Sequence, residues 1–435
     1  MDCLLRRGGY RRMRMRIMPG ELSGRIDPVI ASKSWTHRAL IAAALSEEPT
    51  ILENIAPSAD ARATCHCLEA MGCRIRQKGE GLEIQPGPPA AGEALMDCGE
   101  SGTTLRFLLP VAGVLGIRAA FTGRGKLAER PLSPLYEEMT DHGVRMSPQG
   151  RFPLRIEGKL TAGEYTLAGN VSSQFFSGLL TALPLADGDS RIRIEGELES
   201  APYVEMTRQM LRRFGVRTEK VDGGFWIPGG QKYHSPGRVT VEGDWSGAAF
   251  WLAAGALSRQ GVECGGLNME SAQGDRAILG LLREFGARIE DDGFGGVRVS
   301  RGTLKGIEID AADIPDLVPI LAVTAAFAEG ETVIRHIARL RLKESDRVAS
   351  VVALIRSLGG TAEAAENEMR IFGGGLSGGV ADACNDHRIA MAAAVAGTAS
   401  RGPVEILGAE AVVKSYPGFF EVYRGLGGVA EAMVE

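Results

Sequence analysis

The sequence lacks the features that mark several large classes of protein. Its longest uncharged apolar runs, residues 107–117 and 317–328, are shorter than the about 20 residues that a membrane-spanning helix needs. Its seven cysteines are odd in number and irregularly spaced, so they indicate a reducing compartment, the cytoplasm, rather than a disulfide framework. No second Cys/His pair stands at a suitable distance from Cys65, His66 and Cys67 to complete a zinc site. We therefore expect neither a membrane segment nor a metal.

A strong charge of one sign is also absent. The net charge is −5 and only 6% of the residues are aromatic, so nothing favours a nucleic-acid partner, which requires a continuous basic patch with aromatics. An anion bound by this chain must be held by a local group of Lys and Arg. The basic run at the N-terminus has no apolar core or cleavage site, which excludes a secretory signal. We expect residues 1–14 to be a disordered extension or the product of an upstream start, and a transit peptide is a less favoured alternative.

What the sequence does have is a sixfold internal repeat. Each repeat opens with polar residues and continues into a helix rich in Ala and Leu, and successive openings lie about 70 residues apart. The openings begin at Ser32, Ser101, Ser172, Asp244, Asp313 and Asp386. This period is much longer than that of a solenoid repeat, so each unit must contain several strands and helices.

The segments between the openings predict strands and a second kind of helix. Residues 191–195 and 332–336 have strand character, whereas residues 204–214 and 277–285 carry apolar and charged side chains at helical spacing. Amphipathic helices of this kind lie at the surface, while the Ala-rich helices are apolar nearly all round and should be buried. Six units in two groups of three predict an α/β chain of two domains, each with buried helices inside a coat of sheets and outer helices.

The helix openings share a chemistry that suits anions. The N-terminus of a helix presents free backbone N–H groups and a partial positive charge. Lys33, Arg38, Arg106 and Arg388 lie in or next to these first turns. A Ser, Thr or Asp at one helix start is usually only an N-cap. Because Lys or Arg is added at three of the six starts, the set favours a shared anion-binding site.

Nine segments together resemble the signature segments of the 5-enolpyruvylshikimate-3-phosphate synthase family, in the same order, from about residue 15 to the end of the chain. The segments are Ser32-Lys33-Ser34 with Arg38, Gly102-Thr103 with Arg106, Glu129-Arg130-Pro131, Ser172-Ser173-Gln174, Ser200-Ala201-Pro202-Tyr203, Asp313-Ile314-Pro315-Asp316, Lys343-Glu344-Ser345-Asp346-Arg347, Asn385-Asp386-His387-Arg388 and Lys414-Ser415-Tyr416-Pro417. Each is a weak signal alone, but nine in order are specific.

The resemblance implies the two-domain enolpyruvyl-transferase fold, in which each domain has three βαβαββ repeats with buried helices, an inside-out α/β barrel. Domain I would comprise residues 1–30 and 243–435, and domain II residues 31–242. The chain would cross twice between them, near Ile30 and Glu242, and the active site would lie in the cleft.

The resemblance also implies an activity: transfer of the enolpyruvyl group of phosphoenolpyruvate to the 5-hydroxyl of shikimate 3-phosphate, with release of phosphate, in aromatic amino acid biosynthesis. The residues implied for shikimate 3-phosphate are Lys33, Ser34, Arg38, Ser172, Ser173, Gln174, Ser200, Tyr203, Asp316 and Lys343. Those implied for phosphoenolpyruvate, and for the competing family inhibitor glyphosate, are Lys33, Gly102, Arg130, Gln174, Arg347, Arg388 and Lys414. We expect a monomer whose partners are these small molecules, with no organic cofactor.

The chemistry itself calls for certain groups. Two polyanions must be brought together, which requires many cations and a site that closes. Addition of the hydroxyl across the enol needs a base near that hydroxyl and an acid near the methylene carbon, and the later elimination reverses both roles. Asp316 is the expected base. Glu344 and Lys33 are alternative acids, and Lys33 is also suited to stabilising the leaving phosphate.

Several positions depart from the family pattern. Glu100 stands where Asn is common, and a carboxylate beside an anion site must either point away or pair with a cation. Phe107 replaces a frequent Pro, and Ile30-Ala31 replaces Pro-Gly. Arg339 stands where the family often has an Asn that contacts shikimate 3-phosphate, and we leave it out of the expected site.

The sequence argues against three alternatives. A UDP-N-acetylglucosamine enolpyruvyl transferase normally carries a reactive Cys in a loop of its first domain, and residues 123–131 contain none. A non-catalytic phosphate-binding paralogue should have lost Asp316 or Glu344, and both are present. Residues 373–378 fit G-x-G-x-x-G, but no helix is predicted to open there, so we expect a Gly-rich hairpin and no dinucleotide site.

Overall fold

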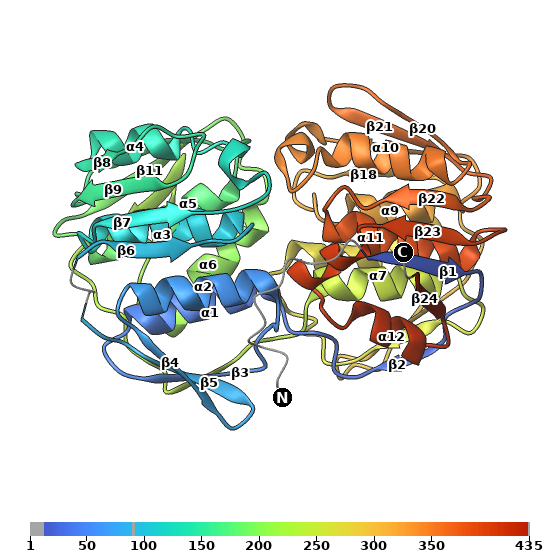
Figure 1. Cartoon of the computed structure of the whole chain (residues 1–435), viewed down its shortest axis with the longest axis horizontal. Coiled ribbons are helices and arrows are strands. Elements are labelled where there is room, and N and C mark those ends of the chain that lie inside the picture. Colours follow the sequence, from blue (N-terminus) through green and yellow to red (C-terminus); the bar gives the residue numbers. More distant parts are fainter. Residues whose placement is uncertain (1–12, 89–91, 434–435) are drawn as a thin grey trace.

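The computed structural model of the protein describes residues 13–88 and 92–433, which form two lobes side by side (Figure 1). We call residues 31–242 the central lobe and the remainder, residues 13–30 and 243–433, the terminal lobe. Each lobe encloses its own hydrophobic core. Within the described residues, no helix is long and apolar enough to cross a membrane.

The central lobe contains three four-stranded sheets among its described residues. Their strand orders are β14 (Arg238–Thr240), β3 (Thr50–Glu53), β5 (Gly81–Gln85), β4 (Arg74–Lys78); β6 (Ala94–Asp97), β7 (Ala119–Thr122), β9 (Leu154–Gly158), β8 (Val144–Met146); and β10 (Glu164–Ala168), β11 (Ser190–Glu195), β13 (Gly224–Ile227), β12 (Glu219–Val221).

The described part of the terminal lobe has three sheets with the same plan. Their orders are β2 (Gly24–Ile26), β15 (Val262–Cys264), β17 (Val297–Ser300), β16 (Arg288–Asp291); β18 (Glu308–Asp310), β19 (Glu331–Arg335), β21 (Glu368–Phe372), β20 (Thr361–Ala364); and β22 (Gly379–Asp382), β23 (Val404–Leu407), β1 (Arg14–Met18), β24 (Val429–Met433). In all six sheets the first pair is parallel and the other pairs are antiparallel. The predicted sixfold α/β repeat is thus confirmed.

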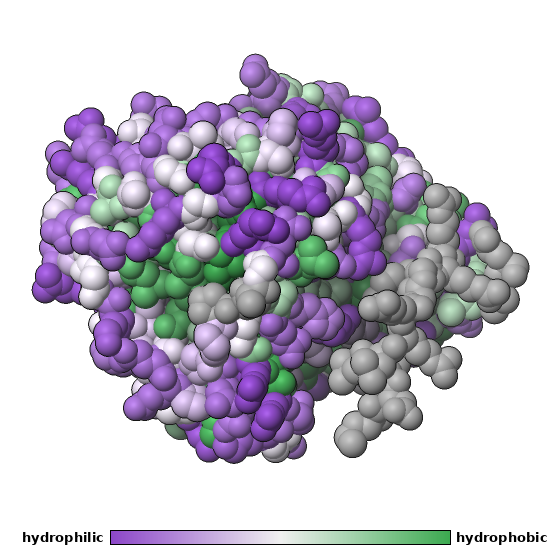
Figure 2. Space-filling view, turned by 60° about the vertical axis from the view of Figure 1, so that its left-hand side comes forward, coloured by the Kyte–Doolittle hydropathy of each residue, from purple (hydrophilic) through white to green (hydrophobic). Residues whose placement is uncertain are grey.

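Two kinds of helix connect these strands. One kind is buried almost completely, because its Ala, Gly and Leu residues allow close packing on every side; it comprises α1 (Lys33–Leu45), α3 (Gly102–Val114), α5 (Ser173–Ala182), α7 (Trp245–Ala256), α9 (Val318–Ala326) and α11 (His387–Ala399). The second kind buries only one face, and it comprises α2 (Ala59–Ala70), α4 (Leu135–Asp141), α6 (Ala201–Arg213), α8 (Ile278–Phe285), α10 (Arg347–Ser357) and α12 (Phe419–Gly425). The surface face in Figure 2 is accordingly largely hydrophilic, with the largest group of apolar side chains near the middle of the view.

Short 3-10 helices complete the structure. They are η1 (Leu127–Glu129), η2 (Leu183–Leu185), η3 (Gly274–Ala277), η4 (Ala338–Leu342) and η5 (Ala409–Lys414). Two of them, η4 and η5, end at residues expected in the site or next to one.

The chain passes between the lobes twice, and the two passages lie against each other. The backbone N–H of Ser32 donates to the carbonyl oxygen of Glu242 at 2.9 Å, and that of Asp244 donates to Ile30 at 2.8 Å. The side chain of Gln273 donates to the Gly243 carbonyl at 2.9 Å and accepts from the Ser32 hydroxyl at 3.3 Å. These bonds fix the connection beside the first residues of α1.

Three local expectations need correction. Arg14 was expected in a disordered extension but begins β1, because this strand pairs with β23 and β24 in the middle of a sheet. Met13 departs from the same expectation, since its N–H donates to Glu410 Oε2 at 2.8 Å, and residues 1–12 lie outside the described residues. The fifth buried helix begins at Val318, not beside Asp313, because Pro319 favours the first helical turn. Residues 373–378 do not form a hairpin, since they join β21 and β22 of different sheets.

Candidate active site

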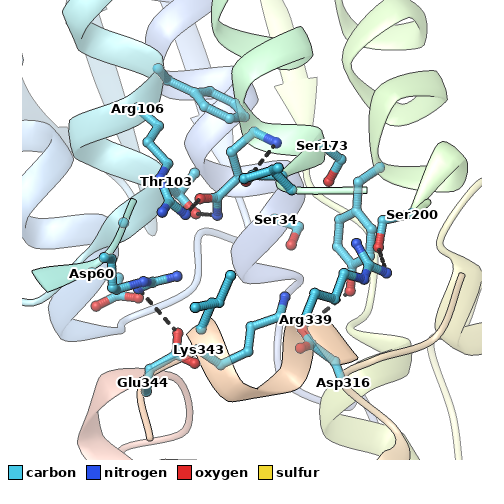
Figure 3. Close-up of a pocket in the computed structure, with 18 of the residues that line it drawn as sticks. Ser34, Asp60, Thr103, Arg106, Ser173, Ser200, Asp316, Arg339, Lys343 and Glu344 are labelled. Carbon is cyan, nitrogen blue, oxygen red and sulfur yellow. Dashed lines mark hydrogen bonds and ion pairs between the residues drawn. The ribbon is translucent and has the colours of Figure 1, made fainter. Parts of the chain in front are cut away.

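A pocket lies between the lobes and is lined by side chains of both (Figure 3). Asp60, Thr103, Arg106 and Ser173 of the central lobe face Asp316, Lys343 and Glu344 of the terminal lobe across it. The pocket brings together thirteen of the residues expected from the sequence: Lys33, Ser34, Arg38, Gly102, Arg130, Ser172, Ser173, Gln174, Ser200, Tyr203, Asp316, Lys343 and Glu344. The first turns of α1, α3 and α5 all open onto it.

The Ser residues at these openings are N-caps as well. Ser101 accepts from the Thr104 N–H at 3.1 Å, and Ser172 accepts from the Gln174 N–H at 3.3 Å. Ser173 is the first residue of α5 and lines the pocket. The cap and the pocket roles therefore coexist, because capping leaves other first-turn N–H groups free for a ligand.

Arg38 is held rigidly at one end of the pocket. Its guanidinium group donates to the Thr207 hydroxyl at 2.8 Å and to the Tyr203 carbonyl at 2.7 Å. It also lies 5.2 Å from the centre of the Phe107 ring, a cation–π distance. Phe107 thus supports a pocket cation, and α3 opens normally around it. Burial lowers the pKa of Arg38 to about 9, so an anionic ligand would strengthen its charged form.

Arg106 positions Gln174. Its guanidinium group donates to Gln174 Oε1 at 2.9 Å and to the Pro131 carbonyl at 2.7 Å, and Gln174 Nε2 donates to the Thr103 hydroxyl at 2.8 Å. Gln174 is therefore fixed from two sides. Arg106 belongs to a segment noted in the sequence, although no ligand was assigned to it.

Arg339, left out of the expected site, lines the pocket. It lies on η4 and only 6% of it is exposed. Its Nη2 donates to the Ser200 hydroxyl at 2.7 Å, and its Nε lies 2.6 Å from Glu199 Oε2, without a hydrogen-bond geometry. Local sequence gave no signal for this pairing, because Ser200 and Arg339 belong to different lobes.

Asp316 lies at the centre of a buried charge network. Arg347 Nη1 donates to its Oδ1 at 2.7 Å, Arg388 Nη2 donates to its Oδ2 at 2.7 Å, and the Tyr203 hydroxyl donates to Oδ2 at 3.2 Å. Burial raises the pKa of Asp316, but Arg388, Arg347 and also Lys343 outweigh burial and hold it well below its usual range. Held by these cations, the carboxylate is a stable anion and a weak base.

Glu344 is similarly held as an anion. Arg347 Nη2 donates to its Oε2 at 2.6 Å, and Arg130 Nη1 lies 3.7 Å from its Oε1. Burial raises the pKa of Glu344, but Arg347 and Arg130 outweigh burial and lower the pKa well below its usual range. The Nε atoms of Arg130 and Arg388 are buried and have no hydrogen-bond partner among the described residues, which leaves donors for an anionic ligand.

The two pocket lysines differ in charge state. Lys33 pairs with Asp60 at 2.9 Å; burial lowers the pKa of Lys33, but Asp60 and Glu344 outweigh burial and raise it. Burial lowers the pKa of Lys343 to about 7, with Arg339 contributing. Lys33 is therefore a charged proton donor near neutrality, whereas Lys343 gains or loses its proton close to neutrality.

Three expected ligands of phosphoenolpyruvate do not line this pocket. Arg388 lines a small adjoining cavity with Lys33 and Ser34. Arg347 is 1% exposed and bound to acids. Lys414 pairs instead with Glu100 at 2.8 Å. Glu100 thus pairs with a cation, one of the two arrangements expected for it.

The fold and the pocket define a two-lobed α/β protein whose lobes enclose a cation-rich site, which is the architecture of enolpyruvyl transferases. The structure is similar to EPSP synthase from Acinetobacter baumannii, with a TM-score of 0.81 and 26% identity over 97% of this chain and 100% of that chain. It also shares its fold with the enolpyruvyl transferase NikO from Streptomyces tendae, with a TM-score of 0.78 and 20% identity over 98% and 99% of the two chains.

The chain belongs to the EPSP synthase (3-phosphoshikimate 1-carboxyvinyltransferase) family, whose profile matches residues 18–423. The 3-phosphoshikimate 1-carboxyvinyltransferase of Clostridium kluyveri is 42% identical over 419 residues, which cover 95% of this chain and 97% of the relative. The protein of the same name from Clostridium acetobutylicum is 42% identical over 422 residues, with the same coverage. The predicted family and fold are confirmed, and the UDP-N-acetylglucosamine alternative is not favoured.

Proposed function

We propose that the protein transfers the enolpyruvyl group of phosphoenolpyruvate to the 5-hydroxyl of shikimate 3-phosphate and releases inorganic phosphate. The observation that carries this proposal is the family match over residues 18–423. The pocket supports it, since its cations suit two polyanionic substrates. We place the reaction in the cytoplasm and assign it to a monomer that needs no organic cofactor.

In this proposal shikimate 3-phosphate occupies the end of the pocket near Arg38, Ser172, Ser200 and Lys343. These side chains offer hydroxyl and cationic donors to a phosphate. Lys343, whose pKa burial lowers to about 7, gains a proton when the dianionic phosphate binds beside it. The 5-hydroxyl of the acceptor then faces Asp316.

Phosphoenolpyruvate occupies the other end, beside the first turn of α3 and Arg130, where Asp316 and Glu344 each bind the buried Arg347. Its carboxylate and phosphate compete for the guanidinium groups that hold Asp316 and Glu344 as anions. Loss of those ion pairs raises the pKa of both carboxyl groups. The donor therefore makes Asp316 a stronger base and lets Glu344 carry a proton that it can donate.

The reaction then proceeds in two steps. Asp316 removes the proton of the 5-hydroxyl while the hydroxyl oxygen attacks C2 of phosphoenolpyruvate. C3 takes a proton from Lys33 or Glu344. In the second step the group that protonated C3 takes a proton back from it, the C2–O bond to phosphate breaks, the double bond re-forms, and the protonated Asp316 can return its proton to the departing phosphate. The charge of Lys33 stabilises the departing phosphate. Lys33 is favoured as the first acid, because its raised pKa keeps it protonated near neutrality, whereas Glu344 must first lose the ion pairs that lower its pKa.

The test is phosphate release from phosphoenolpyruvate, measured with shikimate 3-phosphate, with UDP-N-acetylglucosamine, and with neither. We expect release only with shikimate 3-phosphate, together with an equimolar enolpyruvyl product by mass spectrometry. Lys343→Met should abolish most of it, whereas Lys159→Met, which breaks an exposed ion pair with Asp187, should not. Release that depends on UDP-N-acetylglucosamine would refute the proposed acceptor.

A further inference from the structure

Glu100 joins the two lobes through a contact that belongs to neither core. Its Oε2 accepts from Lys414 Nζ at 2.8 Å and from Asn385 Nδ2 at 2.9 Å. Lys414 Nζ also donates to the carbonyl oxygen of Asn385 at 2.5 Å. Glu100 comes from the central lobe, whereas Lys414 and Asn385 come from the terminal lobe. The carboxylate therefore occupies a site formed by two donors across the cleft.

Glu100 stands next to the pocket because of its place in the chain. It directly precedes Ser101, the N-cap of α3, and Gly102, the first residue of that helix, which lines the pocket. A Cβ atom on Gly102 would lie 2.7 Å from Arg130 Nη1, so the helix opening touches the guanidinium group of Arg130. Glu100 is thus two residues from the contact that forms the donor end of the pocket.

The loop before Arg130 fixes the orientation of this carboxylate. The Arg124 N–H donates to the Gly99 carbonyl at 2.7 Å. Gly125 has a φ of +57°, and a Cβ atom on it would lie 2.5 Å from Glu100 Oε2. The carboxyl group consequently packs against the backbone of Gly125, which has no side chain. The Glu100 side chain is 32% exposed, whereas that of Lys414 is 10% exposed.

We propose that Glu100 is a specificity-determining residue of the donor site, an internal anion that occupies Lys414 and must be displaced by the donor's own anionic group. The inference rests on the proposed function and on Lys414 as a ligand of the donor, the role that the family resemblance implies. Glu100 competes for Lys414 and repels the polyanionic donor, so both effects weaken donor binding. A small anion that reaches Lys414 alone cannot displace the intramolecular carboxylate as readily as a donor that also binds the arginines.

Removing the charge of Glu100 should strengthen donor binding, because other contacts hold the two lobes together. Three other contacts join the same two lobes: Arg130 with Glu344, Arg339 with Glu199, and Tyr203 with Asp316. Closure therefore does not depend on Glu100. Removing its charge frees Lys414 without opening the pocket.

The experiment compares Glu100→Gln with the native protein in steady-state assays that vary phosphoenolpyruvate, shikimate 3-phosphate and the product inhibitor inorganic phosphate. Gln keeps an oxygen for Asn385 and Lys414 but removes the charge. We expect the KM for phosphoenolpyruvate and the inhibition constant of phosphate to fall about 1.5- to fivefold, the range for a partly exposed ion pair. The KM for shikimate 3-phosphate should change far less. Glu93→Gln is the matched control, because Glu93 pairs with Arg155 at 3.3 Å outside the pocket and is 25% exposed.

A second comparison isolates the role of Lys414. In a Lys414→Met background, Glu100→Gln should lower the KM for phosphoenolpyruvate by a smaller factor than in the native background. An equal factor in both backgrounds, or a higher KM in Glu100→Gln alone, would overturn the inference. Calorimetric titration with phosphoenolpyruvate keeps the test separate from the proposed function: an inactive native protein would refute the function, while tighter binding by Glu100→Gln would still support the competition.

Discussion

The substitution Asp316→Asn tests the centre of the proposed mechanism. The amide keeps the shape of the side chain but has no negative charge and no basicity. Asp316 accepts one hydrogen bond from Arg347 and another from Arg388, each at 2.7 Å. Asn presents a single oxygen, so one guanidinium group loses its acceptor and meets an N–H₂ group instead.

The magnitudes follow from those contacts. Removing one partner from a buried ion pair costs about 3–5 kcal/mol, and the remaining acids around Arg347, namely Glu344 and Asp386, reduce the loss to about 2–4 kcal/mol. At about 2–4 °C per kcal/mol for a domain of this size, the midpoint of the terminal lobe should fall by roughly 5–15 °C. Loss of a general base should lower kcat by at least ~10²-fold.

Phosphoenolpyruvate should reverse part of this loss. In the variant its anionic groups face guanidinium groups that no longer bind the carboxylate of residue 316, so equilibrium binding should tighten and the ligand should raise the melting temperature more than in the native protein. Calorimetry measures donor binding, thermal melting with and without the donor measures stability, and single-turnover kinetics measures the chemical step. A kcat within a few-fold of native would show that Asp316 is not the base. A lower kcat with weaker donor binding would show instead that it only positions the guanidinium groups.

Three further predictions concern the substrates. Burial lowers the pKa of Lys343 to about 7, and a bound phosphate dianion raises that pKa. Shikimate 3-phosphate should therefore bind with proton uptake that is large near pH 8 and vanishes below roughly pH 6. Calorimetry in buffers of different ionisation enthalpy measures the uptake, and Lys343→Met should abolish it. Gly102→Ala places a methyl group 2.7 Å from Arg130 Nη1, so it should raise the KM for phosphoenolpyruvate, and raise the inhibition constant of the longer glyphosate by a larger factor; equal factors would mean that Gly102 serves only the backbone. Shikimate 3-phosphate should compact the protein, because its expected ligands come from both lobes; an unchanged radius of gyration in small-angle scattering at saturation would argue against closure.

Local sequence was sufficient for the repeat and for the type of the helices that it predicted. Burial on all sides requires small or apolar residues throughout, as in α7 and α9, and a single buried face requires helical periodicity, as in α6. Both patterns can be recognised within one segment. The same holds for most of the pocket, because Lys33, Gly102 and Ser173 occupy the first turns of helices, where anion-binding chemistry is local.

Tertiary structure alone decided which charges meet. β1 pairs with β23 and β24, a contact between the two ends of the chain that no local pattern encodes. The pairs Arg339 with Ser200 and Lys414 with Glu100 likewise join residues far apart in sequence. The amino-acid sequence by itself determined the family, the repeat and the donors that surround an anion, since these depend on short segments. The ionisation of Asp316 and Lys343 and the partner of Lys414 depend on burial and on distances across the cleft, so only the folded chain decides them.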